Sequence, residues 1–140
     1  MRLVLDTDVI IAAMRSPEGG SAALLNLIDQ GFGTILLSVP FILEYEAICH
    51  LPEHRLASGL NGKEIDVFIS TLVDMAYPVD IHYHWKPQLR DPGDEMVLET
   101  AINGRADALV TFNHKDYGDI PARFGIELML PREALVRIRT

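Results

Sequence analysis

Four acidic residues are of a type that could build a metal site. They are Asp6, Glu44, Asp94 and Asp116, scattered along most of the chain. Gathered at one place, four carboxylates would repel one another by about 3 kcal/mol per pair at about 5 Å and an effective dielectric constant of about 20. A fold that gathers them needs divalent cations, and ligation by oxygen alone favours Mg²⁺ or Mn²⁺ over zinc.

A pair of acids near the start, Asp6 and Asp8 in the segment LVLDTDVII, leaves three interpretations open. Neither carboxylate can be buried cheaply without a partner. The segment indicates a metal site, an aspartate that accepts a phosphoryl group, or a turn that leads into a helix. The acids farther along the chain have to decide among the three.

The apolar pattern predicts strands that alternate with helices. Short strands are expected at 2–5, 34–38, 78–84, 108–111 and 125–130. Helices are expected at 8–14, 21–31, 41–51, 63–76, 93–103 and 132–138, with a loop over 54–62. Pro40 suits the first turn of the third helix, and Pro52 is expected to end it. Such alternation implies a three-layer α/β/α fold around a mainly parallel, twisted sheet of four to five strands.

These elements would place the four acids at one edge of the sheet. Asp6 ends the first strand, and Glu44 lies one turn into the helix after the second strand. Asp94 lies in the first turn of the helix that follows RDPGD, and Asp116 a few residues beyond the strand that ends at Thr111. Ligands of open parallel sheets bind outside the carboxyl ends of the strands. We therefore expect a common site there.

Each acid also has a purely structural interpretation. Asp91 before a proline makes a good N-cap, and Asp94 then lies where an acid favours the helix dipole. Asn113 or Asp116 could cap a short helical turn, and Glu44 could be a solvated position on an apolar helix. The combination, rather than any single residue, favours the metal site.

The composition is that of an ordinary globular protein, with 49% apolar and 23% charged residues among 140. This length favours one domain over residues 1–140. No membrane association is expected, because no apolar run approaches the roughly 20 residues that span a bilayer. The start does not resemble a signal peptide, and the single Cys49 indicates a cytoplasmic protein. A net charge of −8 argues against a protein that coats nucleic acid, but not against an enzyme whose acids surround metal ions.

Four motifs in order, DTDVIIAAM, VPFILEYEAI, RDPGDEMVLETA and ADALVTFNHKDY, resemble a PIN domain. The nearest resemblance is to the small prokaryotic PIN proteins that are toxins of toxin–antitoxin pairs. It covers nearly the full chain, including the closing FGIELMLPREAL. It implies a doubly wound α/β/α fold, a Mg²⁺- or Mn²⁺-dependent ribonuclease site built from acids, and frequently a homodimer.

Carried over by position, the resemblance assigns roles to individual residues. The family's four acids, which would bind the metal and carry catalysis, match Asp6, Glu44, Asp94 and Asp116. Thr111 and Asn113 match the polar pair that supports the site, and Thr7, Asp8 and Asp91 are expected beside the ligands. Two positions depart from the family. Asp8 replaces a usual Asn, and Asn113 replaces an Asp of some relatives, so the role of the fourth acid falls mainly to Asp116.

The resemblance implies an endoribonuclease that hydrolyses RNA phosphodiester bonds, and a small antitoxin protein as its partner. The apolar helices expected at 21–31 and 63–76 could present the groove for that antitoxin.

Two other functions remain as alternatives. A haloacid-dehalogenase-type phosphatase would use Asp6 as nucleophile and Asp8 as acid and base, but it leaves Glu44 and RDPGD without a task. A non-catalytic PIN-like or receiver-like module that binds Mg²⁺ is the second. A receiver would need its phospho-accepting aspartate on the middle strand along the chain, whereas Asp6 follows the first.

Overall fold

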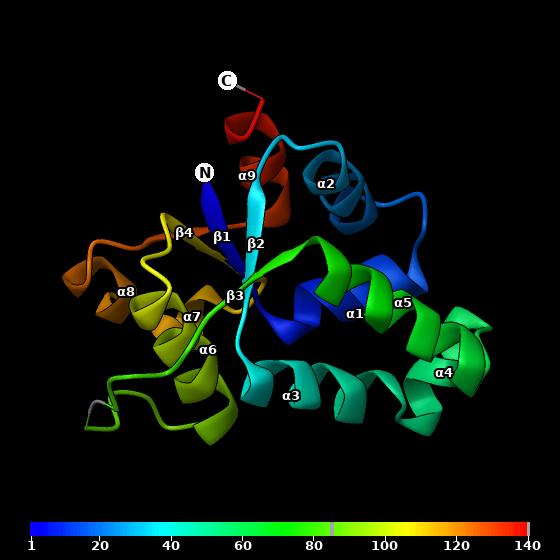
Figure 1. Ribbon diagram of the computed structural model, residues 1–140, viewed down its shortest axis with the longest axis horizontal. Helices are drawn as coiled ribbons and strands as arrows, with labels where there is room; N and C mark the ends of the chain where they lie inside the picture. Colours follow the sequence, from blue (N-terminus) through cyan, green and yellow to red (C-terminus); the bar gives the residue numbers. More distant parts are fainter. Residues whose placement is uncertain (85, 140) are drawn as a thin grey trace.

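The computed structural model describes residues 1–84 and 86–139, in which strands and helices alternate (Figure 1). The strands are β1 (Arg2–Leu5), β2 (Thr34–Leu37), β3 (Ala76–Pro78), β4 (Ala108–Val110) and β5 (Glu127–Met129). The longer helices are α1 (Thr7–Arg15), α2 (Gly20–Asp29), α3 (Val39–Cys49), α5 (Gly62–Met75) and α6 (Pro92–Asn103). The shorter ones are α4 (Pro52–Ser58), α7 (His114–Tyr117), α8 (Ile120–Arg123) and α9 (Pro131–Arg137).

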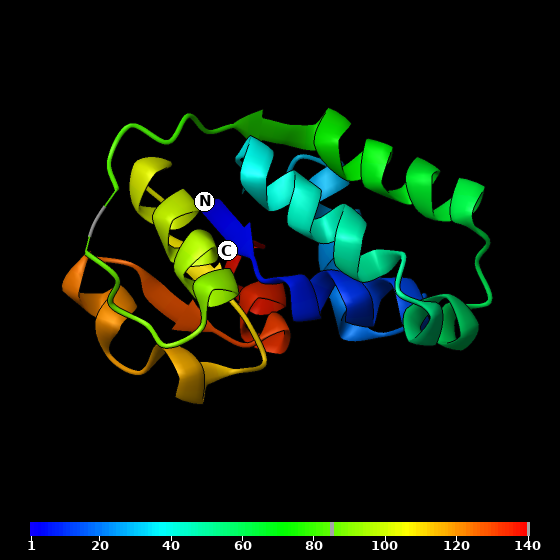
Figure 2. The ribbon, with the colours of Figure 1, turned by 90° about the horizontal axis from the view of Figure 1, so that it is seen from below.

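Within these residues, one parallel sheet of five strands has the order β3-β2-β1-β4-β5. The strand order reverses at β1, where Leu3 pairs with Ile35 on one side and with Ala108 on the other. The chain runs downward along β1 and β2 in Figure 1, so the view from below in Figure 2 looks onto the edge where the strands end. The prediction of a mainly parallel sheet of four to five strands is confirmed.

Helices flank both faces of this sheet, as the sequence predicts. α6 contacts β1, β2 and β4. α2 packs against both α1 and α9. Figure 2 shows α6 on one side of β1 and α1 and α9 on the other. Leu3, Val4 and Leu5 of β1 are fully enclosed, because a parallel strand covered on both faces has no solvent side. The central strand is therefore a rigid base for whatever follows it.

The strand predicted at 78–84 is wrong in extent. The strand begins earlier, at Ala76, and ends at Pro78, and residues 79–84 have no regular structure. Among the described residues β3 pairs with β2 alone, and Pro78 has no N–H with which to continue a ladder. The chain beyond it is held instead by the side chain of Asn103, whose Oδ1 accepts from the N–H groups of His82 (3.0 Å) and Tyr83 (2.9 Å).

The loop predicted over 54–62 is also wrong in part, because α4 occupies residues 52–58. Pro52 was interpreted as the end of the preceding helix, whereas it is the first residue of a new one. Proline suits that position since its fixed φ fits a helix and its missing N–H would have had no partner there. α4 ends at Gly59, whose φ of 75° is open to glycine at little cost.

Two single-turn helices, α7 and α8, follow β4 and were not predicted as elements. Gly118 joins them with a φ of 55° and makes the tight reversal possible. The turn α7 carries Asp116 and Tyr117 back toward the end of β1. Among the described helices, none is both long and apolar enough to cross a membrane.

Candidate active site

A pocket of about 340 Å³ opens at the carboxyl edge of the sheet, where α1, α3 and α6 begin. Figure 2 shows these three helices converging on the end of β1. This pocket, which we call the acid pocket, contains Asp6, Glu44 and Asp94 of the four predicted acids, together with Thr7, Asp8, Asp91 and Asn113. Its other lining residues are Ile11, Ile48, His54 and Gly93. Side chains from distant parts of the chain thus meet where the topology predicts a ligand site.

Asp6 lies at the centre of this arrangement and is only 6% exposed. It is the N-cap of α1, since its Oδ1 accepts from the N–H of Thr7 at 2.8 Å. Its Oδ2 accepts from the hydroxyls of Thr111 (2.8 Å) and Tyr117 (3.0 Å). Burial raises the pKa of Asp6, these hydrogen bonds oppose the rise, and the charge of Asp116 adds to it. Asp6 is therefore held in place by donors from α1, from the segment after β4 and from α7.

Asp8 ties α1 to the segment after β4. Its Oδ2 accepts from the N–H of Phe112 at 3.0 Å and from Nδ2 of Asn113 at 3.1 Å. Its Oδ1 is enclosed and has no hydrogen-bond partner among the described residues. Burial first, and then the neighbouring charge of Asp6, raise the pKa of Asp8 to about 6. The helix cap is thus Asp6, and Asp8 is a half-buried acid with one enclosed, unused oxygen.

Glu44 and Asp91 face each other across the start of α6. Asp91 is the N-cap of α6, its Oδ1 accepting from the N–H of Gly93 at 2.7 Å. Oε1 of Glu44 lies 3.9 Å from the point where a side chain on Gly93 would begin. A hydrogen bond of 2.8 Å between the enclosed hydroxyls of Ser38 and Thr100 joins α3 to α6. This bond fixes the spacing of the helices that carry Glu44 and Asp94.

Asp94 and Asp116 are neighbours, but Asp116 lies outside the acid pocket. It lines an adjoining hollow of about 480 Å³ that it shares with Asp91, Asp94, Arg90 and Lys115. Burial, and after it the charges of Asp6, Asp91 and Asp116, raise the pKa of Asp94 to about 6. Three of the four predicted acids therefore share one pocket, while the fourth acts on them electrostatically from the next.

Tyr117 is a site residue that the sequence did not reveal. It is 1% exposed, and its hydroxyl lies 3.0 Å from Oδ2 of Asp6 and 3.4 Å from Oδ1 of Asp94. Burial and the charges of both acids raise its pKa, so the hydroxyl keeps its proton. The only sequence signal was the position of Tyr117 next to Asp116 in the segment HKDY.

His54 is the second unexpected residue. It lies in α4, lines the acid pocket, and has an enclosed Nδ1 without a partner among the described residues. Its Nε2 is 3.9 Å from Glu53. The sequence predicts that Pro52 ends the preceding helix, and so does not reveal that Pro52 starts the helix that carries His54 to the site.

The donors of this pocket suit a hard divalent cation. In the described part of the chain, none of Asp6, Asp8, Glu44, Asp94 and Asp116 forms an ion pair with Lys, Arg or His. Carboxylates crowded without a counter-charge, two of them with raised pKa values near 6, are what a cation would relieve. Over the same residues, no three Asp, Glu, His or Cys side chains are already arranged to hold one metal ion. Ligation through Oδ2 of Asp6 would compete with its bonds to Thr111 and Tyr117.

The family model of the PIN domain matches residues 2–115, which include the whole acid pocket. The chain belongs to the PIN domain family. PIN domains are generally nucleases, so the family indicates a hydrolase that acts on nucleic acid and disfavours the phosphatase alternative. The match ends at Lys115, one residue before Asp116 and two before Tyr117. No curated protein matches the chain.

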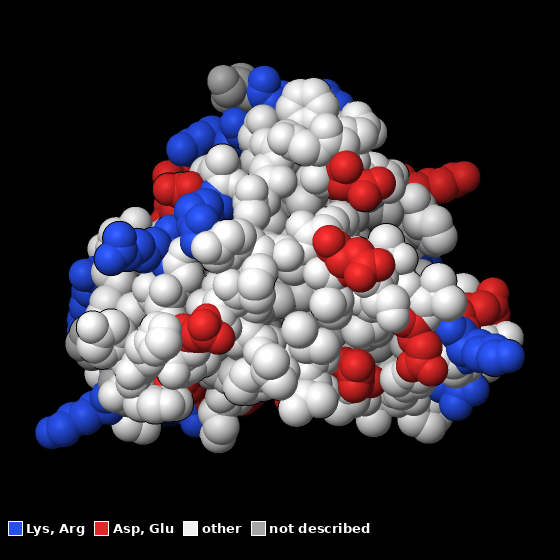
Figure 3. All heavy atoms as spheres, in the orientation of Figure 1, with Lys and Arg blue, Asp and Glu red and all other residues white. Residues whose placement is uncertain are grey.

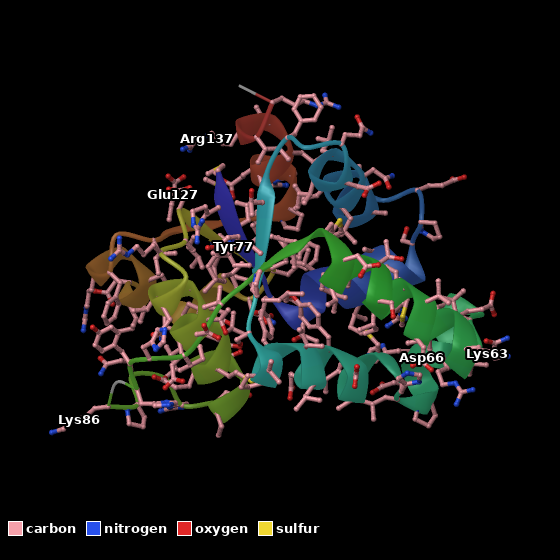
Figure 4. The ribbon with its side chains drawn as sticks, in the orientation of Figure 1. Lys63, Asp66, Tyr77, Lys86, Glu127 and Arg137 are labelled. Carbon is pink, nitrogen blue, oxygen red and sulfur yellow. The ribbon has the colours of Figure 1, made fainter. Side chains whose placement is uncertain are left out.

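The basic side chains of this PIN domain are dispersed. On the face shown in Figure 3, Lys and Arg lie mainly toward the margins and the acids form separate spots. Lys86 extends away from the body of the molecule (Figure 4), whereas Arg90 and Lys115 line the hollow beside Asp94. The cations nearest the acids are thus these two, which form no ion pair with the site carboxylates among the described residues.

Proposed function

We propose that this PIN domain is a Mg²⁺- or Mn²⁺-dependent endoribonuclease whose catalytic metal site is formed by Asp6, Glu44, Asp94 and Asp116. The observation that carries the proposal is the acid pocket at the carboxyl edge of a PIN-type sheet, with its uncompensated carboxylates. A divalent cation held there would make a water molecule more acidic and neutralise charge on the phosphodiester.

The protein's own groups prepare this site. Thr111 donates to Asp6 and at the same time accepts from the N–H of Asn113 at 3.0 Å, which locks the loop after β4 onto the central acid. Asp91 fixes the first turn of α6 and with it Asp94. Such supporting bonds keep the carboxylates in place against their mutual repulsion.

RNA is the proposed substrate, since ribonuclease activity is what the family resemblance of the sequence implies. The cation would supply much of the attraction for phosphate, so a protein with a net charge of −8 needs few basic contacts. Arg90 and Lys115 lie beside Asp94, where they would contact phosphates of the RNA strand next to the site.

We further propose that the enzyme is the toxin of a toxin–antitoxin pair. An apolar hollow of about 340 Å³ is lined by α1 together with α2 and α5, the two helices expected to present an antitoxin groove. Met14, Leu25, Leu60, Phe68 and Met75 are among its lining residues. An amphipathic helix of a small antitoxin would fit such a surface through apolar side chains spaced along one face. Co-purification with the product of a neighbouring short gene tests this role.

A homodimer in the cytoplasm completes the proposal. Val39 and Leu43, four residues apart on one face of α3, are 68% and 58% exposed, and such apolar pairs often mark an interface. The enclosed thiol of Cys49 is compatible with a reducing compartment. Light scattering on the purified chain and on a Leu43→Glu variant tests the dimer, which the charge should disrupt.

Cleavage of labelled single-stranded RNA tests the catalytic proposal. Wild type should cut with Mg²⁺ or Mn²⁺ and not with EDTA. Asp6→Asn and Asp94→Asn should each lose more than about 100-fold in rate, since even residues beside metal ligands cost about 10–100-fold. Asp66→Asn is the control, because Asp66 is exposed and pairs with His50 at 2.8 Å outside the acid pocket. Cleavage that survives in both site variants would overturn the four-acid site.

A further inference from the structure

A further hollow lies on the same edge of the sheet, at the ends of β4 and β5. It has a volume of about 410 Å³ and we call it the α2 hollow, because the first turn of α2 forms one wall. Its lining residues are Ala12, Ser16, Gly19, Gly20, Ser21, Phe112, Leu130, Pro131 and Arg132. None of them is assigned a role by the acid pocket, although Phe112 directly follows Thr111, which is bonded to Asp6.

One wall of the α2 hollow can bind an anion. Gly19 is the N-cap of the ten-residue helix α2 and offers no side chain to its first turn. The N–H of Gly19 bonds to Ser16 and that of Ala23 to Gly19, whereas the N–H groups of Gly20 and Ser21 have no acceptor among the described residues. Free N–H groups at a helix start, together with the helix dipole, favour a negatively charged ligand.

Ser21 gives independent support for a ligand at this wall. The residue is 5% exposed and its Oγ is enclosed without a hydrogen-bond partner in the described part of the chain. A buried hydroxyl without a partner is unfavourable, so an acceptor that reached it from the hollow would be stabilised. Arg132 also lines the hollow and could pair with a phosphate through its guanidinium group.

The opposite wall suits a planar ring. Phe112 is 50% exposed and lines the hollow, so its ring is accessible to a ligand there. Its position is fixed because its own N–H donates to Oδ2 of Asp8 at 3.0 Å. Exposed aromatic rings bind the bases of single-stranded nucleic acids by stacking, without preference for one base.

We propose that the α2 hollow binds one nucleotide of the single-stranded RNA substrate, its base stacked on Phe112 and its phosphate held by the start of α2 and Arg132. This inference rests on the proposed ribonuclease function and assigns the strand a path from the acid pocket past residues 111–113 into the hollow. The acids near this path are Asp6, bonded to Thr111, Asp8, bonded to Phe112 and Asn113, Glu18, which precedes Gly19, and Glu133. Oδ2 of Asp8 is engaged with backbone and amide donors, and Oε1 of Glu133 accepts from the N–H of Leu130 at 2.8 Å.

Binding of a fluorescent single-stranded RNA, followed by anisotropy in EDTA at several salt concentrations, tests the site apart from cleavage. Phe112→Ala should weaken binding about tenfold without changing its salt dependence, since stacking involves no ion release. Arg132→Gln should weaken binding and reduce the slope of log affinity against log salt by about 0.7, the value for one lost phosphate contact on a single strand. Ser21→Ala should weaken binding while leaving the melting temperature unchanged or higher, because it removes an unpaired buried hydroxyl.

Matched controls come from the opposite edge of the molecule. Phe32, 46% exposed in the turn before β2, and Arg105, in the turn before β4, give Phe32→Ala and Arg105→Gln, which should bind as wild type does. Nuclear magnetic resonance on the ¹⁵N-labelled protein separates the two halves of the ligand. Adenosine 5′-monophosphate should shift the amide signals of both Gly20 and Phe112, whereas inorganic phosphate should shift Gly20 alone.

The outcomes separate this inference from the proposed function. RNA cleavage by wild type, with Phe112→Ala and Arg132→Gln binding as tightly as their controls, would overturn the nucleotide site and leave the nuclease intact. Failure of wild type to cut or bind RNA would overturn both. Shifts of Gly20 with phosphate but no effect of Phe112→Ala on RNA binding would reduce the hollow to a phosphate site and reject the stacking.

Discussion

The hydroxyl of Tyr117 lies between two acids, 3.0 Å from Oδ2 of Asp6 and 3.4 Å from Oδ1 of Asp94. It has one proton to donate, and the shorter distance assigns that proton to Asp6. The longer bond to Asp94 is the weaker one, and it only partly offsets the rise of the Asp94 pKa to about 6, which burial causes first. Tyr117 thus bridges two acids of the site.

The Tyr117→Phe variant tests whether this bridge is a substitute for metal. Removing the hydroxyl takes a hydrogen bond from the buried Asp6, so the metal-free protein should lose about 1–2 kcal/mol of unfolding free energy. Because Mg²⁺ would no longer compete with the hydroxyl, the rise in melting temperature on adding Mg²⁺ should be at least as large as in wild type. Thermal melts in EDTA and in Mg²⁺ give both quantities.

Tyr45→Phe is the matched control. Tyr45 is also fully enclosed, but its hydroxyl donates to the carbonyl oxygen of Leu5 rather than to a carboxylate. It should lower the melting temperature equally with and without Mg²⁺. A Tyr117→Phe protein that no longer gains stability from Mg²⁺ would mean that the hydroxyl helps to organise the metal site rather than competing for it.

The sequence predicted the positions of the acids better than their surroundings. Asp6 could be placed because an acid after a buried strand stands at a sheet edge, whatever the details. The partner Tyr117 could not, because its contact with Asp6 spans 111 positions and depends on the path of two single-turn helices. Ligation itself remains a prediction for all four acids.

The fold shows the same division. The parallel sheet follows from alternating apolar segments, and its central strands are where the sequence predicts them. The errors lie at two prolines, because proline can either end one element or begin the next. Pro52 begins α4 rather than only ending α3, and Pro78 ends a strand that the sequence predicts to start there. The local sequence is compatible with either structure, and tertiary contacts, such as the bonds from Asn103 to residues 82–83, select one of them.

Stability should depend on pH through Asp8 and Asp94. Their pKa values are about 6 in the folded protein against 3.8 in the unfolded chain, so the folded state binds more protons between these values. The free energy of unfolding therefore falls as pH rises from about 4 to about 6, and the loss is complete above that window. After solvent screening we expect about 1 kcal/mol per group, or about 3–5 °C in melting temperature.

Asp94→Asn isolates this contribution. In EDTA, the variant should melt above wild type at pH 7 and equal to it near pH 4, where the wild-type carboxyl is protonated. Mg²⁺ should raise the melting temperature of wild type at pH 7 and have little effect near pH 4, because protonated carboxyls are poor ligands. Equal melting of variant and wild type at pH 7 would contradict the crowding of charges in the pocket.

Asp116 should matter less for cleavage than the three acids of the pocket. It lines the adjoining hollow, lies outside the matched family segment, and acts on Asp6 and Asp94 through its charge. Asp116→Asn should therefore reduce the cleavage rate about tenfold, against more than about 100-fold for Asp94→Asn. Asp119→Asn is the control in the same hollow, because Asp119 is paired with Arg123 at 3.3 Å and should leave the rate unchanged. Equal losses for Asp116→Asn and Asp94→Asn would contradict this ranking and make Asp116 as important to cleavage as the acids of the pocket.

His54 should contribute to cleavage from the α4 side of the pocket. Its imidazole lines the pocket beside the acids, where it would meet the substrate, and its Nδ1 is enclosed without a partner among the described residues. We expect His54→Ala to lower the cleavage rate about tenfold, with a melting temperature within about 2 °C of wild type, because no hydrogen bond of Nδ1 is lost. His50→Ala is the matched control: His50 is paired with Asp66 at 2.8 Å outside the pocket and should affect only stability. If both variants cut RNA at the wild-type rate, His54 is a wall of the pocket and takes no part in the reaction.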